Sequence, residues 1–188
     1  MNSLLWISYG ILWVVVLLLG AGMIVMLREH ADLMLGSREG RSRVHGPPEG
    51  ATAPGLEGEE VVLAATATER PRVVLFMAVT CDPCWRRIPQ VSHFAADQAE
   101  AVETLVCCSG PVERVREFAG ELGPEVSVIA DPAGDAAGSW RVYMTPFAVG
   151  VDRDGIVRGK VANPAYDNLT LLSRLLVAGA GDEPTRAA

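Results

Sequence analysis

Lysine is almost missing from this 188-residue sequence, which contains a single one, Lys160. Acidic side chains outnumber basic ones by 23 to 16, and the formal net charge is −7. Proteins that bind nucleic acid usually carry a basic patch or stripe, which scattered arginines in an acidic chain do not provide. We therefore expect no nucleic-acid partner.

Charged side chains are also absent from residues 1–27, and nearly every residue from Leu4 to Leu27 is apolar. A helix needs about 20 apolar residues to cross the hydrocarbon core of a bilayer. A cleaved secretory signal would have a basic start and a shorter apolar core of roughly 7–15 residues. Because the first basic residue is Arg28, we predict a retained transmembrane helix over residues 1–28, in contact with the lipid bilayer. A cleaved signal is the alternative.

The remainder of the chain divides into three parts. Residues 29–45 carry mixed charge with two glycines, Gly36 and Gly40, and are predicted to be a linker. Residues 46–180 form the predicted folded domain, and residues 181–188 are a small, polar and flexible tail.

Within the predicted domain, short apolar runs alternate with segments of helical spacing. Strands are expected at Glu60–Thr66, Arg72–Val79, Thr104–Cys108, Val126–Ala130, Phe147–Asp152 and Ile156–Val161, and helices at Cys81–Gln98, Pro111–Leu122, Ala136–Tyr143 and Asp167–Ala178. The last two strands flank Arg153-Asp154-Gly155, which is typical of a hairpin. This order predicts an α/β fold with a central mixed sheet flanked by helices.

Cysteine is scarce, and four residues are too few for a disulfide scaffold. Cys81 and Cys84, however, stand where the strongest predicted strand meets a helix. Unpaired N–H groups at a helix start stabilise an anion, and the thiolate is the reactive form of cysteine. We expect Cys81 to attack and Cys84, one turn along, to resolve the mixed disulfide. Pro83 suits the first turn, whereas Asp82 opposes thiolate formation and argues against a strongly oxidising potential.

A CxxC pair is alternatively half of a structural zinc site, which needs four ligands. The remaining candidates lack ligand spacing: His30, His45, His93 and the neighbouring Cys107 and Cys108. We therefore expect neither a metal nor a cofactor. Cys107 and Cys108 end a predicted strand whose alternation points them to opposite faces, so at least one is expected to be buried as a small apolar core residue, with a redox role as the alternative.

Together these residues resemble the thioredoxin superfamily, in its membrane-anchored TlpA-like branch, and most closely the thioredoxin-like accessory proteins of methylamine utilisation. Besides the Cys81–Cys84 motif, Pro89 matches the family's helix-kinking proline. Thr145-Pro146 matches its cis-proline, and the stretches 46–54 and 155–163 also look like that family.

The resemblance implies a thioredoxin-like sandwich that exchanges disulfides with the thiols or disulfides of client proteins. It implies that Thr145 and Pro146 dock the substrate chain, and that Pro83, Trp85 and Pro89 support the site. The client would be an exported protein, and a membrane or soluble redox partner would restore the cysteine pair.

The sequence also departs from the family. Thr80 stands where many relatives have tryptophan, and Leu75 stands where thioredoxin has a buried aspartate that assists proton transfer. Because Leu75 cannot accept a proton, the second change argues against fast, thioredoxin-like reduction. Arg86 and Arg87 follow the motif and are expected to form a solvated helix face.

The membrane orientation receives conflicting signals. Arginines follow the apolar segment, which by the positive-inside rule favours a cytoplasmic domain. The family resemblance implies an extracytoplasmic domain, where disulfides persist, and we adopt that orientation for a single-pass protein of the cell membrane.

The alternative function is a tethered adaptor or chaperone-like binding module with no essential redox chemistry. A peroxidase is disfavoured because Ala78 occupies the place of the peroxiredoxin threonine, three residues before the reactive cysteine.

Overall fold

The chain divides into two compact units in a computed structural model that describes residues 2–36, 44–56, 58–62 and 70–178. The units are Met1–Arg41 and Ser42–Ala188.

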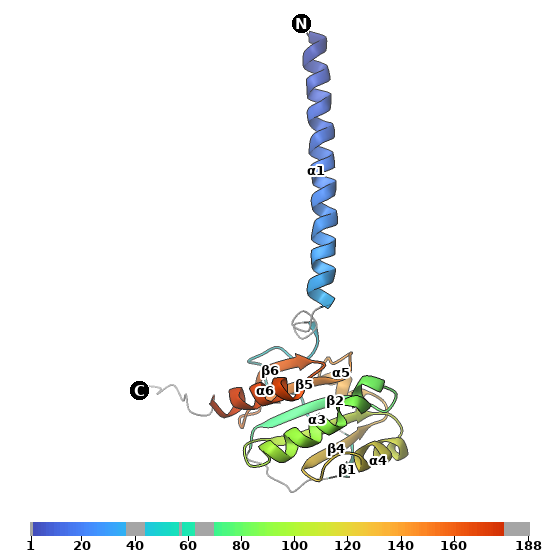
Figure 1. The fold of residues 1–188 in the computed structure, drawn as a ribbon, viewed down its shortest axis with the longest axis vertical. Helices are drawn as coiled ribbons and strands as arrows, with labels where there is room; N and C mark the ends of the chain where they lie inside the picture. Colours follow the sequence, from blue (N-terminus) through green and yellow to red (C-terminus); the bar gives the residue numbers. More distant parts are fainter. Residues whose placement is uncertain (1, 37–43, 57, 63–69, 179–188) are drawn as a thin grey trace, which may run out of the picture. The chain divides into compact units, whose positions relative to one another are not determined.

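The first unit contains helix α1 (Asn2–Gly36), blue in Figure 1. Among the described residues it is the helix long and apolar enough to cross a membrane, over Trp6–Met26, and the side chains of that span are exposed. The predicted N-terminal apolar helix is therefore confirmed. It continues beyond residue 28 into the range predicted as a linker. Residues 37–43 of that range and the predicted tail, 181–188, lie outside the described residues.

The second unit is built on a sheet in which the described residues supply six strands in the order β1-β4-β3-β2-β5-β6. β2, β3 and β4 are parallel, whereas β1 pairs antiparallel with β4, and β5 antiparallel with both β2 and β6. The sheet is therefore mixed, as predicted. The strand bounds are β1 Glu59–Val62, β2 Arg72–Ala78, β3 Glu103–Ser109, β4 Val126–Asp131, β5 Phe147–Val151 and β6 Val157–Ala162.

Alternation along the strands divides the buried side chains into two cores, one on each face of the sheet. In β2, Val73, Leu75 and Met77 belong to one core, and Val74 and Phe76 belong to the other. All five are at most 1% exposed. A central strand covered on both faces must be apolar throughout, which explains the unbroken apolar run of β2.

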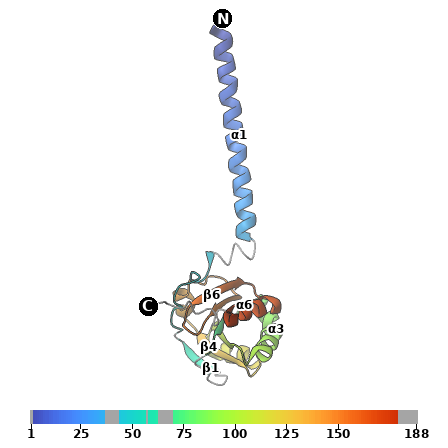
Figure 2. The ribbon, with the colours of Figure 1, turned by 90° about the vertical axis from the view of Figure 1, so that its left-hand side faces the viewer.

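Three helices cover the face on which Leu75 lies: α3 (Asp82–Gln98), α4 (Val112–Gly120) and α6 (Tyr166–Ala178). Figures 1 and 2 show α3 and α6 side by side, and the two helices are in contact. The predicted sandwich of a sheet flanked by helices is confirmed.

The opposite face is covered in part by a short helix, α5 (Asp135–Ser139), together with the buried ring of Trp140. The sequence predicted a longer helix, to Tyr143. It ends earlier because Arg141 adopts a left-handed conformation, with φ at +55°, which an α-helix does not accommodate.

The sheet register brings together two motifs that are distant in the sequence. β5 runs antiparallel to β2, and Phe147 pairs with Phe76. The end of β2, which leads to Cys81, therefore lies at the same sheet edge as the start of β5, which Pro146 immediately precedes.

Candidate active site

Cys81 and Cys84 occupy the start of α3. Cys81 has extended backbone angles (φ −99°, ψ 100°) and is the N-cap residue, and its Sγ accepts a hydrogen bond from the backbone N–H of Cys84 at 3.2 Å. The Cys81 carbonyl accepts hydrogen bonds from the N–H groups of Cys84 and Trp85 at 2.9 and 3.3 Å. Pro83 lies in the first helical turn, where its missing N–H would have no helical partner.

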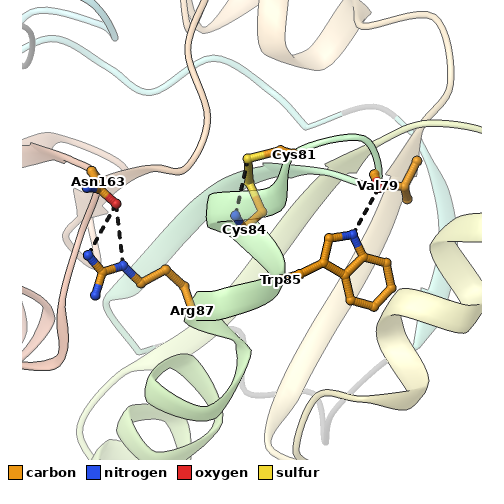
Figure 3. Close-up of a disulfide and its surroundings, with 6 residues drawn as sticks. All are labelled: Val79, Cys81, Cys84, Trp85, Arg87 and Asn163. Carbon is orange, nitrogen blue, oxygen red and sulfur yellow. Dashed lines mark hydrogen bonds between the residues drawn. A yellow bond between two sulfur atoms is a disulfide. The ribbon is translucent and has the colours of Figure 1, made fainter.

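The two cysteines are joined by a disulfide, with their Cα atoms 5.2 Å apart. Cys84 is fully buried at 0% exposure, whereas Cys81 is half-buried. Figure 3 shows the pair at the first turn of α3. Of the two sulfur atoms, that of Cys81 belongs to the more accessible residue.

Trp85 ties the loop before the disulfide to the helix after it (Figure 3). Its indole Nε1–H donates to the carbonyl of Val79 at 2.9 Å. Its ring meets that of Phe118 edge-on, with ring centroids 4.7 Å apart. The N–H of Val79 in turn donates to the Ser109 carbonyl at 3.1 Å, so the turn leading to Cys81 is held from α3 and from β3.

Pro89 lies inside α3 and is exposed. A proline there cannot donate a hydrogen bond to the carbonyl one turn earlier, that of Trp85. The helix nevertheless continues to Gln98.

Thr145 and Pro146 form the loop that enters β5, and the peptide bond between them is cis. Pro146 is buried, Thr145 is half-buried, and the Pro146 carbonyl accepts a hydrogen bond from the backbone N–H of Asn163 at 2.8 Å. Asn163 directly follows β6, so this bond extends the β5–β6 pairing by one position.

Arg87 differs from the expected solvated helix face. It is half-buried, and its Nε and Nη2 donate to the Oδ1 of Asn163 at 3.4 and 3.3 Å. Figure 3 shows this contact on the side of α3 away from Trp85. Arg86 is exposed, as expected. No local pattern could have identified the Arg87 contact, because its partner lies 76 positions later.

Cys107 and Cys108 lie on opposite faces of the sheet in β3, as the sequence indicated, and both are buried. Burial raises the pKa of each thiol to about 12, and for Cys107 the charges of Asp131 and Cys108 add to the effect. The Cys107 thiol lies 4.0 Å from the Oδ2 of Asp131. Such thiols remain protonated and unreactive at neutral pH.

Among the described residues, Asp131 is the only carboxylate that is buried, and it lies on the face opposite to Cys84. Its two oxygens accept hydrogen bonds from the N–H groups of Ala136 and Ala137, at 3.3 and 3.0 Å. Leu75, fully buried, belongs to the core of Cys84. In the described part of the chain, no three His, Cys, Asp or Glu side chains are grouped as metal ligands.

Comparison with known proteins gives consistent matches. A family model described as Redoxin matches residues 47–170. The methylamine utilization protein MauD of Paracoccus versutus is 31% identical over 178 residues, which cover 91% of this chain and 85% of that protein. The protein of the same name from Methylorubrum extorquens is 28% identical over 136 residues, covering 68% of this chain and 64% of that protein.

Solved structures with similar folds include the following two. MTB DsbF, solved in mixed oxidized and reduced forms, has a TM-score of 0.51 at 22% identity, covering 63% of this chain and 92% of that one. A thiol:disulfide interchange protein of the thioredoxin family from Chlorobium tepidum has a TM-score of 0.57 at 16% identity, covering 70% and 99%. At these identities the structures establish the fold alone.

Proposed function

Because this chain belongs to the Redoxin family, as a thioredoxin-superfamily protein related to MauD, we propose that it is a membrane-anchored enzyme that exchanges disulfides with client proteins through Cys81 and Cys84. The observation that carries the proposal is the Cys81–Cys84 disulfide at the first turn of α3. A thiol–disulfide redox role follows from the family. The roles of individual residues, the clients and the cellular location are proposed.

The exchange proceeds in two displacements. The Cys81 thiolate attacks one sulfur of a client disulfide, so that a bond forms between Cys81 and that sulfur while the client S–S bond breaks. The second client sulfur leaves as a thiolate and takes up a proton. Cys84 then loses its proton and attacks the Cys81 sulfur, which releases the first client sulfur and forms the Cys81–Cys84 disulfide. The client gains two electrons, and the enzyme dithiol loses them.

The same steps in reverse move two electrons from a client dithiol to the Cys81–Cys84 disulfide. In either direction, a membrane or soluble redox partner must restore the starting state of the pair. The position of Cys81 at the N-cap supports its role as the attacking group, because the N–H of Cys84 is already directed at its sulfur and the positive end of the helix dipole favours a thiolate there.

Proton release from Cys84 differs from that proposed for thioredoxin, whose buried aspartate position is occupied here by Leu75. The only buried carboxylate of the described residues lies on the other face of the sheet, so the Cys84 proton has to reach water or another group. This route predicts slower exchange than in an enzyme with a buried base.

We propose that Thr145 and Pro146 dock the client chain. The sheet register supports this role, because it places the start of β5 beside the end of β2 that leads to Cys81. An extended client segment lying along this loop would present its disulfide to Cys81. Pro83, Trp85 and Pro89 are proposed to support the reactive turn.

We further propose that α1 retains the protein in the cell membrane with its redox domain outside the cytoplasm. Its apolar span is long enough to cross a bilayer, and disulfide exchange suits an oxidising compartment. The names of the MauD relatives refer to methylamine utilization, and an exported protein of such a system is the proposed class of client.

The direct test is the variant Cys84→Ser, which removes the resolving thiol and leaves Cys81 able to attack. We expect it to accumulate client proteins linked through Cys81, visible as higher-mass species on non-reducing gels that collapse on reduction. Cys81→Ser should trap no client at that position. If Cys81→Ser cells process clients as wild type does, the chain is a tethered binding module and the enzyme proposal is wrong.

A further inference from the structure

The guanidinium group of Arg87 makes three hydrogen bonds beside the cysteine pair. Two go to the Oδ1 of Asn163, at 3.4 and 3.3 Å, and one joins Nη1 to the Oε1 of Gln90, at 2.8 Å. Gln90 lies one turn along the same helix and therefore helps to orient the guanidinium group. Hydrogen bonds from a charged donor are stronger than those between neutral groups.

Asn163 connects Arg87 to the Thr145–Pro146 loop. Its backbone N–H donates to the Pro146 carbonyl at 2.8 Å, while its side chain accepts from Arg87. It adopts a left-handed conformation with φ at +47°, which asparagine tolerates better than most residues. One residue thus links the helix of Cys84 to the loop that enters β5.

We infer that Arg87 is a positioning residue, which through Asn163 holds the Thr145–Pro146 loop at the spacing from the cysteine pair that an extended client chain requires. This inference rests on the proposed function. Hydrogen bonds to an extended peptide are directional, so a shift of the loop relative to α3 weakens docking. Attack by a small thiol on the half-buried Cys81 needs no such loop.

A positioning role and a purely structural role of Arg87 predict different results for a peptide substrate and for a small dithiol. If Arg87 only stabilised the fold, its loss would affect reactions with large and small thiols alike. If it positions the loop, its loss raises the half-saturating concentration of a peptide and leaves reduction by a small dithiol nearly unchanged.

The experiment uses the oxidised full-length chain in detergent micelles and follows loss of the Cys81–Cys84 disulfide. The two reductants are an extended twelve-residue peptide dithiol and dithiothreitol. For Arg87→Met we expect the half-saturating peptide concentration to rise about five- to ten-fold, with the dithiothreitol rate within about two-fold of wild type. Arg86→Met is the matched control, because it removes the same charge from the neighbouring, exposed position and should change neither value by more than about two-fold.

Variants of Asn163 test the other half of the contact. Asn163→Gly suits the left-handed backbone and keeps the N–H that bonds Pro146, so it removes only the acceptor of Arg87. It should reproduce the peptide defect, and the double variant with Arg87→Met should be no worse than either single one. Asn163→Asp keeps an acceptor for the guanidinium group and should restore peptide saturation to within about two-fold of wild type.

Equal losses with both reductants, or a peptide half-saturation in Arg87→Met that matches Arg86→Met, would overturn the inference. If Arg87→Met does not fold, Asn163→Gly with its Asn163→Asp counterpart decides the question by the same comparison. A wild-type chain that oxidises neither reductant, or a Cys81→Ser chain that still oxidises the peptide, would instead refute the proposed function.

Discussion

At the scale of single residues, the four cysteines have two distinct chemical environments. Cys81 and Cys84 stand at a helix start, where backbone N–H groups are available to a sulfur anion. Cys107 and Cys108 lie inside a central strand at no more than 1% exposure. Cysteine is therefore a candidate nucleophile at the helix start and a small apolar core residue in the central strand.

Burial of Cys107 and Cys108 predicts selective labelling. With each pKa at about 12, roughly one thiol in ten thousand is ionised at pH 8. After reduction, iodoacetamide should label Cys81 in the folded protein and leave Cys107 and Cys108 unmodified, and all should be labelled in denaturant. Peptide mass spectrometry makes the measurement. Labelling of Cys107 or Cys108 in the folded protein, at the rate found in denaturant, would contradict their burial.

The same pKa shifts predict how stability depends on pH. A thiol whose folded-state pKa is raised from 9.0 to about 12 contributes stability that is complete below pH 9 and is lost as pH rises toward 12. The midpoint of denaturant unfolding should therefore fall over this range. In the double variant Cys107→Ala/Cys108→Ala the fall should be shallower than in wild type, although its midpoint at pH 7 should be lower. Parallel curves would show that these thiols do not titrate on unfolding.

At the scale of elements, α6 lies close to the β5–β6 hairpin because the hairpin carries a facing pair of glycines. Gly150 and Gly159 are cross-strand partners. A Cβ added at Gly150 would lie 2.8 Å from the Cδ1 of Leu172, and one at Gly159 would lie 2.9 Å from the same atom. Leu172 is buried, so the two glycines create the space that it fills.

This packing predicts that Gly150→Ala destabilises the redox domain by about 1–3 kcal/mol, the usual cost of an extra methyl group in a filled core. Denaturant unfolding measures the change. Leu172→Ala alone should also destabilise, by about 2–5 kcal/mol. The double variant should lose clearly less than the sum, because each change relieves the other. Gly123→Ala is the control, because the added Cβ would meet only ordinary contact distances. Gly134→Ala is unsuitable, since the φ of +79° at that position introduces strain.

At the scale of the whole molecule, the proposed membrane anchor would place the cysteine pair on one side of the bilayer. The proposed orientation predicts that a membrane-impermeant thiol reagent, applied to intact cells after brief reduction, labels Cys81. Labelling without prior reduction would also place the domain outside, with the pair held reduced. Labelling that requires lysis would put the domain in the cytoplasm and refute the orientation, in agreement with the arginines that follow the apolar span. Cys107 and Cys108, being buried, should not interfere.

The sequence alone determined the elements whose signals are local. The uncharged N-terminal run predicted α1, and the unbroken apolar run of β2 predicted a strand covered on both faces. The Cys81–Cys84 spacing at a strand–helix junction predicted the first turn of α3. These signals depend on residues within a few positions of one another, which is why they could be recognised without the fold.

Only the tertiary structure decided the contacts between distant segments. Arg87 was expected to face solvent, yet it meets Asn163, 76 positions away, because the sheet order places the end of β6 near α3. The pairing of Gly150 with Gly159 under Leu172, and the contact of Asp131 with Cys107, likewise depend on register and on which face a strand presents. Local spacing does not encode strand order, so the arrangement around the cysteine pair became visible only when the strands were placed side by side.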